Sequence, residues 1–337
     1  MAQPNDCAYK THGRVGSTMR RRTFGAIAAL SIAWPYPATA QSNVPMVGIL
    51  ALGNPDPAPL VQGIKAGLAD LGYAEGKNIR FEVRSAEGVA SRLEPMARDL
   101  VALKADVLVA YQTPAALAAK AATSETPIVL GQVADPVAGG FVKSLSHPGG
   151  NITGVSGPAT EITPKNLELL KEAVPGAKRV VVLANEPDAF HKRFVESVQS
   201  AGANSNTEIK VRLAKAGDDF DEHFAQIKSW GADAVIVQPS LPLSEVAESA
   251  ARSRMPSASP NSAYPPAGGL MAYAADFNSM NRQIAGVIDK VLRGRKPADL
   301  PVEYTTSFRL SLNAKTANLI GLVLSPHLLA RADDVIE

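Results

Sequence analysis

The sequence predicts an α/β protein built from two Rossmann-like lobes with mainly parallel sheets. Short apolar strands alternate with amphipathic helices along the chain, and the connecting loops are short. The alternation runs as far as a loop-rich stretch, residues 127–156, and restarts after it. A chain of 337 residues that is 46% hydrophobic is long enough for about two such lobes, each with its own core.

The stretch 127–156 links the two series of elements. It begins with an apolar strand at residues 128–130 and breaks at Asp135, which precedes a proline. We expect a short helical piece at residues 141–142 and extended structure again at residues 151–155. A cleft between two α/β lobes is a natural place to hold a small molecule.

The first series contains three strands and three helices. Apolar residues three and four apart mark the helices, and alternating or β-branched runs mark the strands. Ser91 and Glu94 fit a capping box, and Thr113 followed by Pro114 fits an N-cap with proline at the first helical position. The expected strands are 46–52, 79–83 and 105–111, and the expected helices are 61–71, 91–100 and 114–122.

The second series repeats this plan. Thr163 and Pro164 are expected to begin its first helix, and the continuous apolar run that starts at Arg179 is typical of a strand covered on both faces. The extended segment that starts at Gly269 is expected to cross back to the first lobe. The expected strands are 179–184, 208–213, 234–237, 256–260, 269–276 and 302–312, and the expected helices are 163–174, 190–202, 220–227, 244–254, 280–291 and 314–320.

Composition argues against several classes of protein. The net charge is +2, and residues 1–40 hold five basic side chains against a single acidic one, so the rest lacks the basic face of a nucleic-acid binder. Cys7 is the only cysteine, and the five histidines have no paired spacing, so neither a disulfide nor a metal site is expected. The nucleotide-binding and hydrolase glycine motifs are missing, so we expect neither an enzyme nor a cofactor.

Residues 1–40 have the order of an upstream extension and a secretory signal peptide. Arginines at 20–22 precede an apolar run, residues 24–34, that is too short to span a bilayer, and small residues predict cleavage after Ala40. The arginines also fit a twin-arginine signal, and either Met1 or Met19 can be the start. The alternative is a buried N-terminal helix; with a leader, the mature protein is expected to be exported and soluble.

Polar residues that follow predicted strands are candidates for ligand binding, because the carboxyl ends of parallel strands meet at one edge. Free amides at Ala115 and Ala116, with the Thr113 hydroxyl, would suit a carboxylate, unless Thr113 only caps its own helix. Asp135 would accept hydrogen bonds from an ammonium group or cap a turn. Tyr111 would wall the pocket or simply end a buried strand. The first-series candidates are Asn54, Tyr111, Gln112, Thr113, Gln132 and Asp135.

The second series supplies amides and an aromatic ring. Asn185 and Gln238 follow strands and suit hydrogen bonds of either polarity, with ordinary loop contacts as the alternative. Tyr264 would stack on an aromatic ligand or act as a surface anchor. Asp276 would contact the ligand or only cap the last long helix. The second-series candidates are Asn185, Gln238, Asn261, Tyr264 and Asp276.

Five segments of the chain together resemble one known family. They are the leader followed by VGIL, then DPVAGGFVKSLSHPGGNITGVSG, TPKNLELLKEAVPGAKRVVVLAN, YAADFNSMNRQIAGVIDKVLRGRKPADLPVE and NAKTANLIGLVLSPHLLARADDVIE. In this order, from about residue 44 to residue 337, they are similar to ABC-transporter substrate-binding proteins of the tryptophan/tyrosine-binding type. The family often has a glycine near position 112 and Tyr-Gly-x-Asp near 273, where this chain has Gln112 and Tyr-Ala-Ala-Asp.

The resemblance implies a monomeric periplasmic receptor of type I architecture. Its lobes would close on a small carboxylate, aromatic or amino-acid-like, and deliver it to an ABC permease in the inner membrane. A periplasmic sensor that reports to a membrane receptor is the alternative. The implied lobes are residues 44–154 plus 270–302 and residues 155–269 plus 303–337. Our own hypothesis is that the lobes close by hinge bending at the crossings near Val155, Gly269 and Val302.

Overall fold

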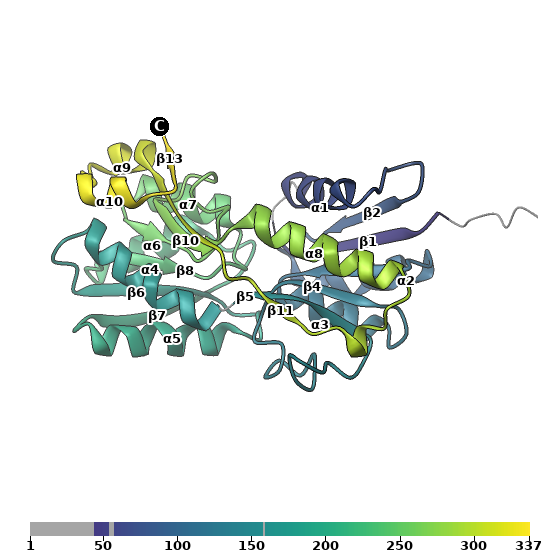
Figure 1. Cartoon of the computed structure of the whole chain (residues 1–337). Helices are drawn as coiled ribbons and strands as arrows, with labels where there is room; N and C mark the ends of the chain where they lie inside the picture. Colours follow the sequence, from purple (N-terminus) through teal and green to yellow (C-terminus); the bar gives the residue numbers. More distant parts are fainter. Residues whose placement is uncertain (1–43, 54–56, 158) are drawn as a thin grey trace, which may run out of the picture. The chain divides into compact units, whose positions relative to one another are not determined.

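Two β-sheets organise the part of the chain that the computed structural model describes, namely residues 44–53, 57–157 and 159–337 (Figure 1). These described residues form one compact unit. The predicted leader, with its start and cleavage sites, lies outside the described residues. No helix within the described ranges is long and apolar enough to cross a membrane.

The first sheet is parallel at every described strand pair and is covered by helices on both faces. Helices α2 (Leu93–Ala102) and α3 (Thr113–Ala122) pack on one face, and α1 (Ala58–Asp70) and α8 (Phe277–Leu292) pack on the other. The strands, in sheet order, are β11 (Glu303–Tyr304), β5 (Ile152–Gly157), β4 (Ile128–Ala134), β3 (Val107–Tyr111), β1 (Met46–Ala51) and β2 (Arg80–Ser85).

The second sheet is parallel except where β10 meets β12. One face carries α4 (Ala159–Ala173), α5 (His191–Asn204), α9 (Ala314–Ile320) and α10 (Pro326–Arg331), and the other carries α6 (Phe220–Ser229) and α7 (Leu243–Arg252). The strands, in sheet order, are β13 (Asp334–Ile336), β12 (Phe308–Asn313), β10 (Met271–Ala275), β9 (Ser257–Ala258), β8 (Ala234–Val237), β6 (Arg179–Asn185) and β7 (Glu208–Ala214).

Both sheets therefore confirm the predicted fold class, two α/β units with mainly parallel strands. Buried β-branched and aliphatic residues fill each strand, as in Val180 to Ala184 of β6, because helices cover both faces. Each fully buried valine or leucine of this kind contributes about 1.5–3 kcal/mol relative to an exposed one.

The chain passes between the sheets at three places. It passes from β5 of the first sheet to α4 of the second, from β10 of the second to α8 of the first, and from β11 of the first to β12 of the second. The return therefore falls at Asp276, after β10, rather than at Gly269 as expected. The predicted strand 302–312 is two strands that belong to different sheets.

Several local predictions are wrong. A 3-10 helix, Ala90–Arg92, precedes α2, and Arg92 at the cap position accepts no hydrogen bond from the helix amides through its side chain, so there is no capping box at Ser91. Pro164 lies inside α4 and not at its start. Residues 141–142 form no helix, because their buried side chains pack against the first core from a turn. A second 3-10 helix, Pro297–Asp299, follows α8.

Helix α8 reaches close to α1 because glycine lies at the contact. A Cβ on Gly63 would lie 2.3 Å from Asn281 Nδ2, so a larger residue would push the helices apart. Ile284 and Ile288 of α8 are fully buried in the first core. This packing fixes the N-terminus of α8, where Asp276 lies.

Candidate functional site

Most of the predicted polar residues lie at the carboxyl edges of the two sheets. In the first sheet, Gln112 follows β3, Gln132 lies within β4 and Asp135 follows it. In the second sheet, Asn185 ends β6 and Gln238 follows β8. Open α/β sheets bind ligands outside the carboxyl ends of their strands, so the predicted side chains lie where ligand contacts are expected.

Gln112 is the single residue that connects β3 to α3. Its N–H donates to Gly131 O at 2.9 Å, and its own carbonyl accepts from Ala116 N at 3.1 Å. Its backbone angles are φ 73° and ψ 156°. The buried side chain accepts from Gly53 N at 3.1 Å through Oε1 and donates to Pro239 O at 3.2 Å through Nε2. Because Pro239 follows β8, Gln112 joins the edges of the two sheets.

Thr113 is the first helical residue of α3 and not its N-cap, so that prediction is wrong. Gln112 takes the non-helical cap position one residue earlier and makes no side-chain cap bond. The Thr113 hydroxyl instead accepts from Ala134 N at 3.4 Å, which ties α3 to the end of β4. The expected free amide at Ala116 is also wrong, because that N–H is bonded to the Gln112 carbonyl.

The end of β4 contains two non-glycine residues in the left-handed region. A bulge between Gly131 and Val133 places Gln132 at φ 53°, and Asp135 has φ 39°. Gln132 Oε1 is buried, and no described residue forms a hydrogen bond with it. Asp135 Oδ1 accepts from Ala138 N at 3.0 Å, so Asp135 does cap its turn.

Asp135 also pairs with a residue of the second series. Its Oδ2 accepts from the guanidinium of Arg193, on α5. The two side chains are 36% and 46% exposed, so this ion pair is worth roughly 0–1 kcal/mol.

Asn185 and Gln238 belong to one buried hydrogen-bond network. The Asn185 N–H donates to Gln238 Oε1 at 2.8 Å, and Asn185 Nδ2 donates to Ser240 O at 3.0 Å. Gln238 Nε2 and Ser240 Oγ donate to Asp188 Oδ2 at 2.7 and 2.5 Å. Burial raises the pKa of Asp188, and hydrogen bonds from Ser240 and the Phe190 N–H oppose that rise. The network fixes which way each amide points.

Asn261 reaches the same carbonyl as Gln112. Its Nδ2 lies 3.5 Å from Pro239 O, and its Oδ1 accepts from Ala263 N at 2.9 Å. Tyr264 is fully buried, and its hydroxyl donates to Ser257 Oγ at 2.7 Å. Burial raises the pKa of Tyr264. The surface-anchor alternative for Tyr264 is therefore wrong, and stacking on a ligand stays a prediction that its burial does not favour.

Tyr111 and Asn54 complete the first-series candidates. Tyr111 ends β3 within the first core, where burial raises its pKa. A Cβ on Gly131 would lie 2.9 Å from Tyr111 Cδ2, so the ring packs against the neighbouring strand. Asn54 lies outside the described residues.

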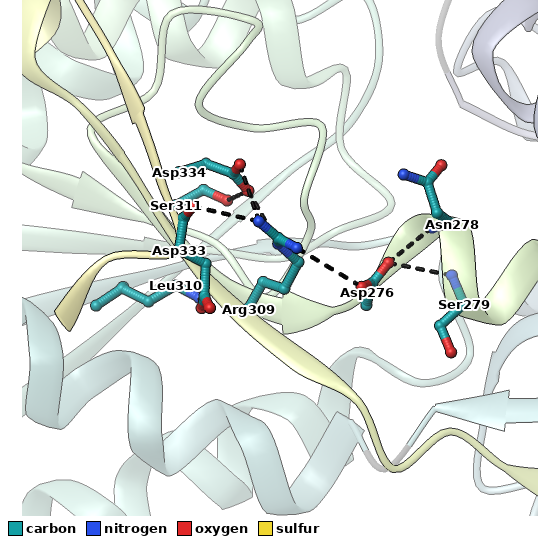
Figure 2. Close-up of polar contacts among 8 residues, drawn as sticks. All are labelled: Asp276, Asn278, Ser279, Arg309, Leu310, Ser311, Asp333 and Asp334. Atoms are coloured by element: carbon teal, nitrogen blue, oxygen red, sulfur yellow. Dashed lines mark hydrogen bonds and ion pairs between the residues drawn. The ribbon is translucent and has the colours of Figure 1, made fainter.

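Asp276 begins α8, as Figure 2 shows. Its Oδ1 accepts from Asn278 N at 2.9 Å and from Ser279 N at 3.1 Å, which confirms it as the N-cap. Arg309 Nη1 lies 3.9 Å from Asp276 Oδ2, while Arg309 Nε and Nη2 bind the Asp334 carboxylate at 3.1 and 3.0 Å. Arg309 thus lies between Asp276, where the chain returns to the first sheet, and Asp334 of the C-terminal strand β13.

Four side chains of these contacts were not predicted from the sequence, namely those of Asp188, Ser240, Arg193 and Arg309. Asp188 lies in the loop after β6, so the rule that selected Asn185 would have selected it too. Arg193 and Arg309 gave no signal, because basic residues on exposed positions are common and their partners are distant in sequence.

The structure brings Gln112, Asn261 and the Asn185–Gln238–Asp188 network together around residues 238–240. These groups supply amide donors and acceptors and one buried carboxylate. Within the described ranges, no three His, Cys, Asp or Glu residues are placed to hold a metal ion. The chemistry suits reversible binding of a small polar molecule.

Two surface hollows contain none of the predicted site residues, although Arg193, the partner of Asp135, lines one of them. One lies over α4 and α5 beside Arg193, and the other lies between α7 and α9 beside Leu319. They lie over helices and not over strand ends, so the strand ends define the candidate site.

Two mainly parallel sheets, three crossings and polar strand ends define the type I periplasmic binding protein fold. Solved structures with that architecture match the chain; one from Vibrio cholerae, described as a conserved domain protein, has a TM-score of 0.78 and 26% identity over 87% of this chain and 99% of its own. The chain belongs to the ABC transporter substrate binding protein family, whose model matches residues 50–336. The family predicted from the sequence is therefore confirmed.

Two relatives have named ligands. A Clostridioides difficile protein named tyrosine-binding protein is 27% identical over 267 residues, which cover 77% of this chain and 76% of the relative. The structure of an ABC domain in complex with L-Trp, from Streptococcus pneumonia, has a TM-score of 0.78 and 27% identity, covering 87% of this chain and 99% of its own.

Proposed function

We propose that this substrate-binding protein is the exported receptor of an ABC importer and that its solute is an aromatic amino acid. The observation that carries the proposal is the partly buried hydrogen bond from Gln112 Nε2 to Pro239 O at 3.2 Å, which joins polar strand ends of both sheets. A solute held there would contact both halves and favour their closure. The relatives named for tyrosine and bound to L-Trp support the choice of solute.

The proposed binding is carried by the chain's own polar groups. The Asn185–Gln238 pair offers an amide surface whose orientation Asp188 fixes, and Asp276 and Asp135 are acidic groups suited to an ammonium. The proposal also includes a leader removed after Ala40, a periplasmic location and a monomeric mature protein that meets its permease in the inner membrane.

The test is calorimetry on the protein purified from the periplasm of an expressing cell. L-Tyr and L-Trp are compared with indole-3-propionate, which lacks the amine, tryptamine, which lacks the carboxylate, and indole, which lacks both. We expect saturable binding of the amino acids, weaker binding of each analogue, and stabilisation by about 2.7 kcal/mol at a ligand concentration of 100 times Kd.

Variants locate the site. Gln238→Ala should weaken binding, whereas Gln62→Ala, at an exposed position on α1, should not. The intact mass of the purified protein shows where the leader is cleaved. Absence of binding by every aromatic amino acid, or equal effects of the two variants, would contradict the proposal.

A further inference from the structure

Gln112 has a backbone conformation that side chains rarely adopt. With φ 73° and ψ 156°, it lies in a region that essentially only glycine occupies without strain. Backbone hydrogen bonds on both sides of the residue hold this conformation. The Gln112 N–H donates to Gly131 O, the last bond between β3 and β4, and the Gln112 carbonyl accepts from Ala116 N, the first bond of α3. Glycine would relieve the strain here, so the glutamine side chain must have a compensating use.

The side chain of Gln112 uses both ends of its amide across the two sheets. Oε1 accepts from Gly53 N at 3.1 Å after β1, and Nε2 donates to Pro239 O at 3.2 Å after β8. A Cβ on Gly53 would lie 3.1 Å from Gln112 Oε1, so the loop after β1 approaches the amide closely. Only 6% of Gln112 is exposed, and both of its side-chain hydrogen bonds are partly buried, so water competes with them less than it does at the surface.

The partner of Gln112 lies within the buried hydrogen-bond network of the second sheet. Pro239 lies between Gln238 and Ser240, which both donate to Asp188. Opening of the two halves would break the bond from Nε2, while Asn261 Nδ2, from the same half as Pro239, would remain near that carbonyl.

We infer that Gln112 is a latch: its strained backbone presents an amide that bonds the second sheet and raises the closed population of the free protein. This inference rests on the proposed function, because a latch affects affinity only if the protein closes on a solute. Gln112 is then a positioning residue that sets affinity without choosing the ligand. When only a fraction of the free protein is closed, apparent affinity falls in proportion to that fraction.

The latch is tested in the full chain with no ligand present. Spin labels on Ala102→Cys of α2 and Ala203→Cys of α5, both exposed positions, report the distance between the halves, with Cys7→Ser as background. Four proteins are compared with the wild type: Gln112→Glu, Gln112→Ala, Gln112→Gly and the exposed control Gln62→Glu.

Gln112→Glu keeps the length of the side chain and the acceptor for Gly53 N but loses the donor to Pro239 O. It should shift the distance distribution towards longer values and raise the Kd for L-tryptophan roughly fivefold to tenfold, the loss of one ordinary hydrogen bond. Gln112→Ala and Gln112→Gly should show the same shift. Because glycine removes the strain, Gln112→Gly should melt at a higher temperature than Gln112→Ala.

The two proposals fail in different ways. A distance distribution unchanged in all three Gln112 variants, in a protein that binds L-tryptophan, would overturn the latch and leave the proposed function intact. A shifted distribution in a protein that binds no aromatic amino acid would support the latch and contradict the proposed function. A lower melting temperature in Gln112→Glu without a change in distance would assign Gln112 a purely structural role.

Discussion

The two edges that form the candidate site are built on different principles. At the first sheet, Gln112, Gln132 and Asp135 all have positive φ, so their side chains are aimed by an unusual backbone. At the second sheet, Asn185, Asp188, Gln238 and Ser240 lie in a buried network of side-chain hydrogen bonds, and none of them has positive φ.

This difference suggests different tasks. A hydrogen-bond network specifies one arrangement and resists change, because each lost partner leaves a buried group unsatisfied. Strained residues store free energy that a small movement can release. In the function proposed above, the second edge would recognise the solute and the first edge would respond to it.

Loss of the carboxylate at the centre of the network should have the largest effect. Asp188→Ala leaves Gln238 Nε2, Ser240 Oγ and the Phe190 N–H without their acceptor, so we expect a loss of about 3 kcal/mol in the free energy of unfolding. Urea denaturation measures it. Asp221→Ala, which removes an exposed aspartate on α6, should cost much less than Asp188→Ala, and equal losses would show that burial of the network is unimportant.

Asp188 should also shape the pH dependence of stability. Its pKa in the folded protein is raised by burial above the ordinary value of 3.8, so the folded state holds this proton more tightly than the unfolded state. Its burial therefore costs nothing below 3.8 and costs progressively more as pH rises through the folded pKa. The stability of the wild type relative to Asp188→Asn should fall over that window, and a flat difference would contradict the shifted pKa.

Gln238 at the second edge and Gln132 at the first edge give the most direct comparison of the two edges. Gln238→Gly should cost about 2–3 kcal/mol, because Asp188 and the Asn185 N–H lose a partner inside the network. Gln132→Gly should be neutral or stabilising by up to about 1 kcal/mol, because glycine accepts φ 53° without strain. Thermal unfolding of the two variants tests whether the first edge is strained. If Gln132→Gly is more destabilised than Gln238→Gly, the first edge is not strained.

The two N-cap aspartates separate stability from binding. Asp276→Ala and Asp219→Ala each remove the acceptor for two helix amides, at α8 and α6, and each should cost about 1 kcal/mol. Only Asp276→Ala should also weaken ligand binding, because Asp276 is at the return crossing beside Arg309. Calorimetry on both variants measures this, and equal affinities would remove Asp276 from the site.

The exposed ion pair should matter least. Arg193→Ala removes the partner of Asp135 and should change stability by no more than about 1 kcal/mol, with the effect vanishing at high salt. Unfolding measured at low and high ionic strength tests this. A large effect that salt does not reduce would mean that the ion pair stabilises the contact between the two sheets more than its exposure to solvent implies.

Local sequence patterns predicted the helices and strands better than the crossings between the two sheets. The β6 run and the α8 stripe were found because burial on both faces, or on one helical face, leaves a periodic trace in the sequence. The two-residue strand β11 leaves no such trace, because its pairing with β5 is made by residues about 150 positions away.

The site was predicted by position more than by chemistry. The rule that polar residues follow strand ends located Gln112, Asn185 and Gln238 correctly at the sheet edges. It could not foresee the positive φ of Gln112 or the burial of Tyr264, because both depend on packing between distant segments. Thr113 was favoured for its capping chemistry, yet the strained turn one residue earlier displaced it.

The return of α8 to the first sheet has a consequence for how this protein can be dissected. Neither half is encoded by one continuous stretch of gene, since the first sheet needs α8 and β11 from beyond residue 276. A fragment that ends before Phe277 would leave the apolar face of α1, with Ile64 and Leu68, without its cover. Chimeras that exchange specificity between relatives would therefore require three matched junctions, because a single splice would divide a core.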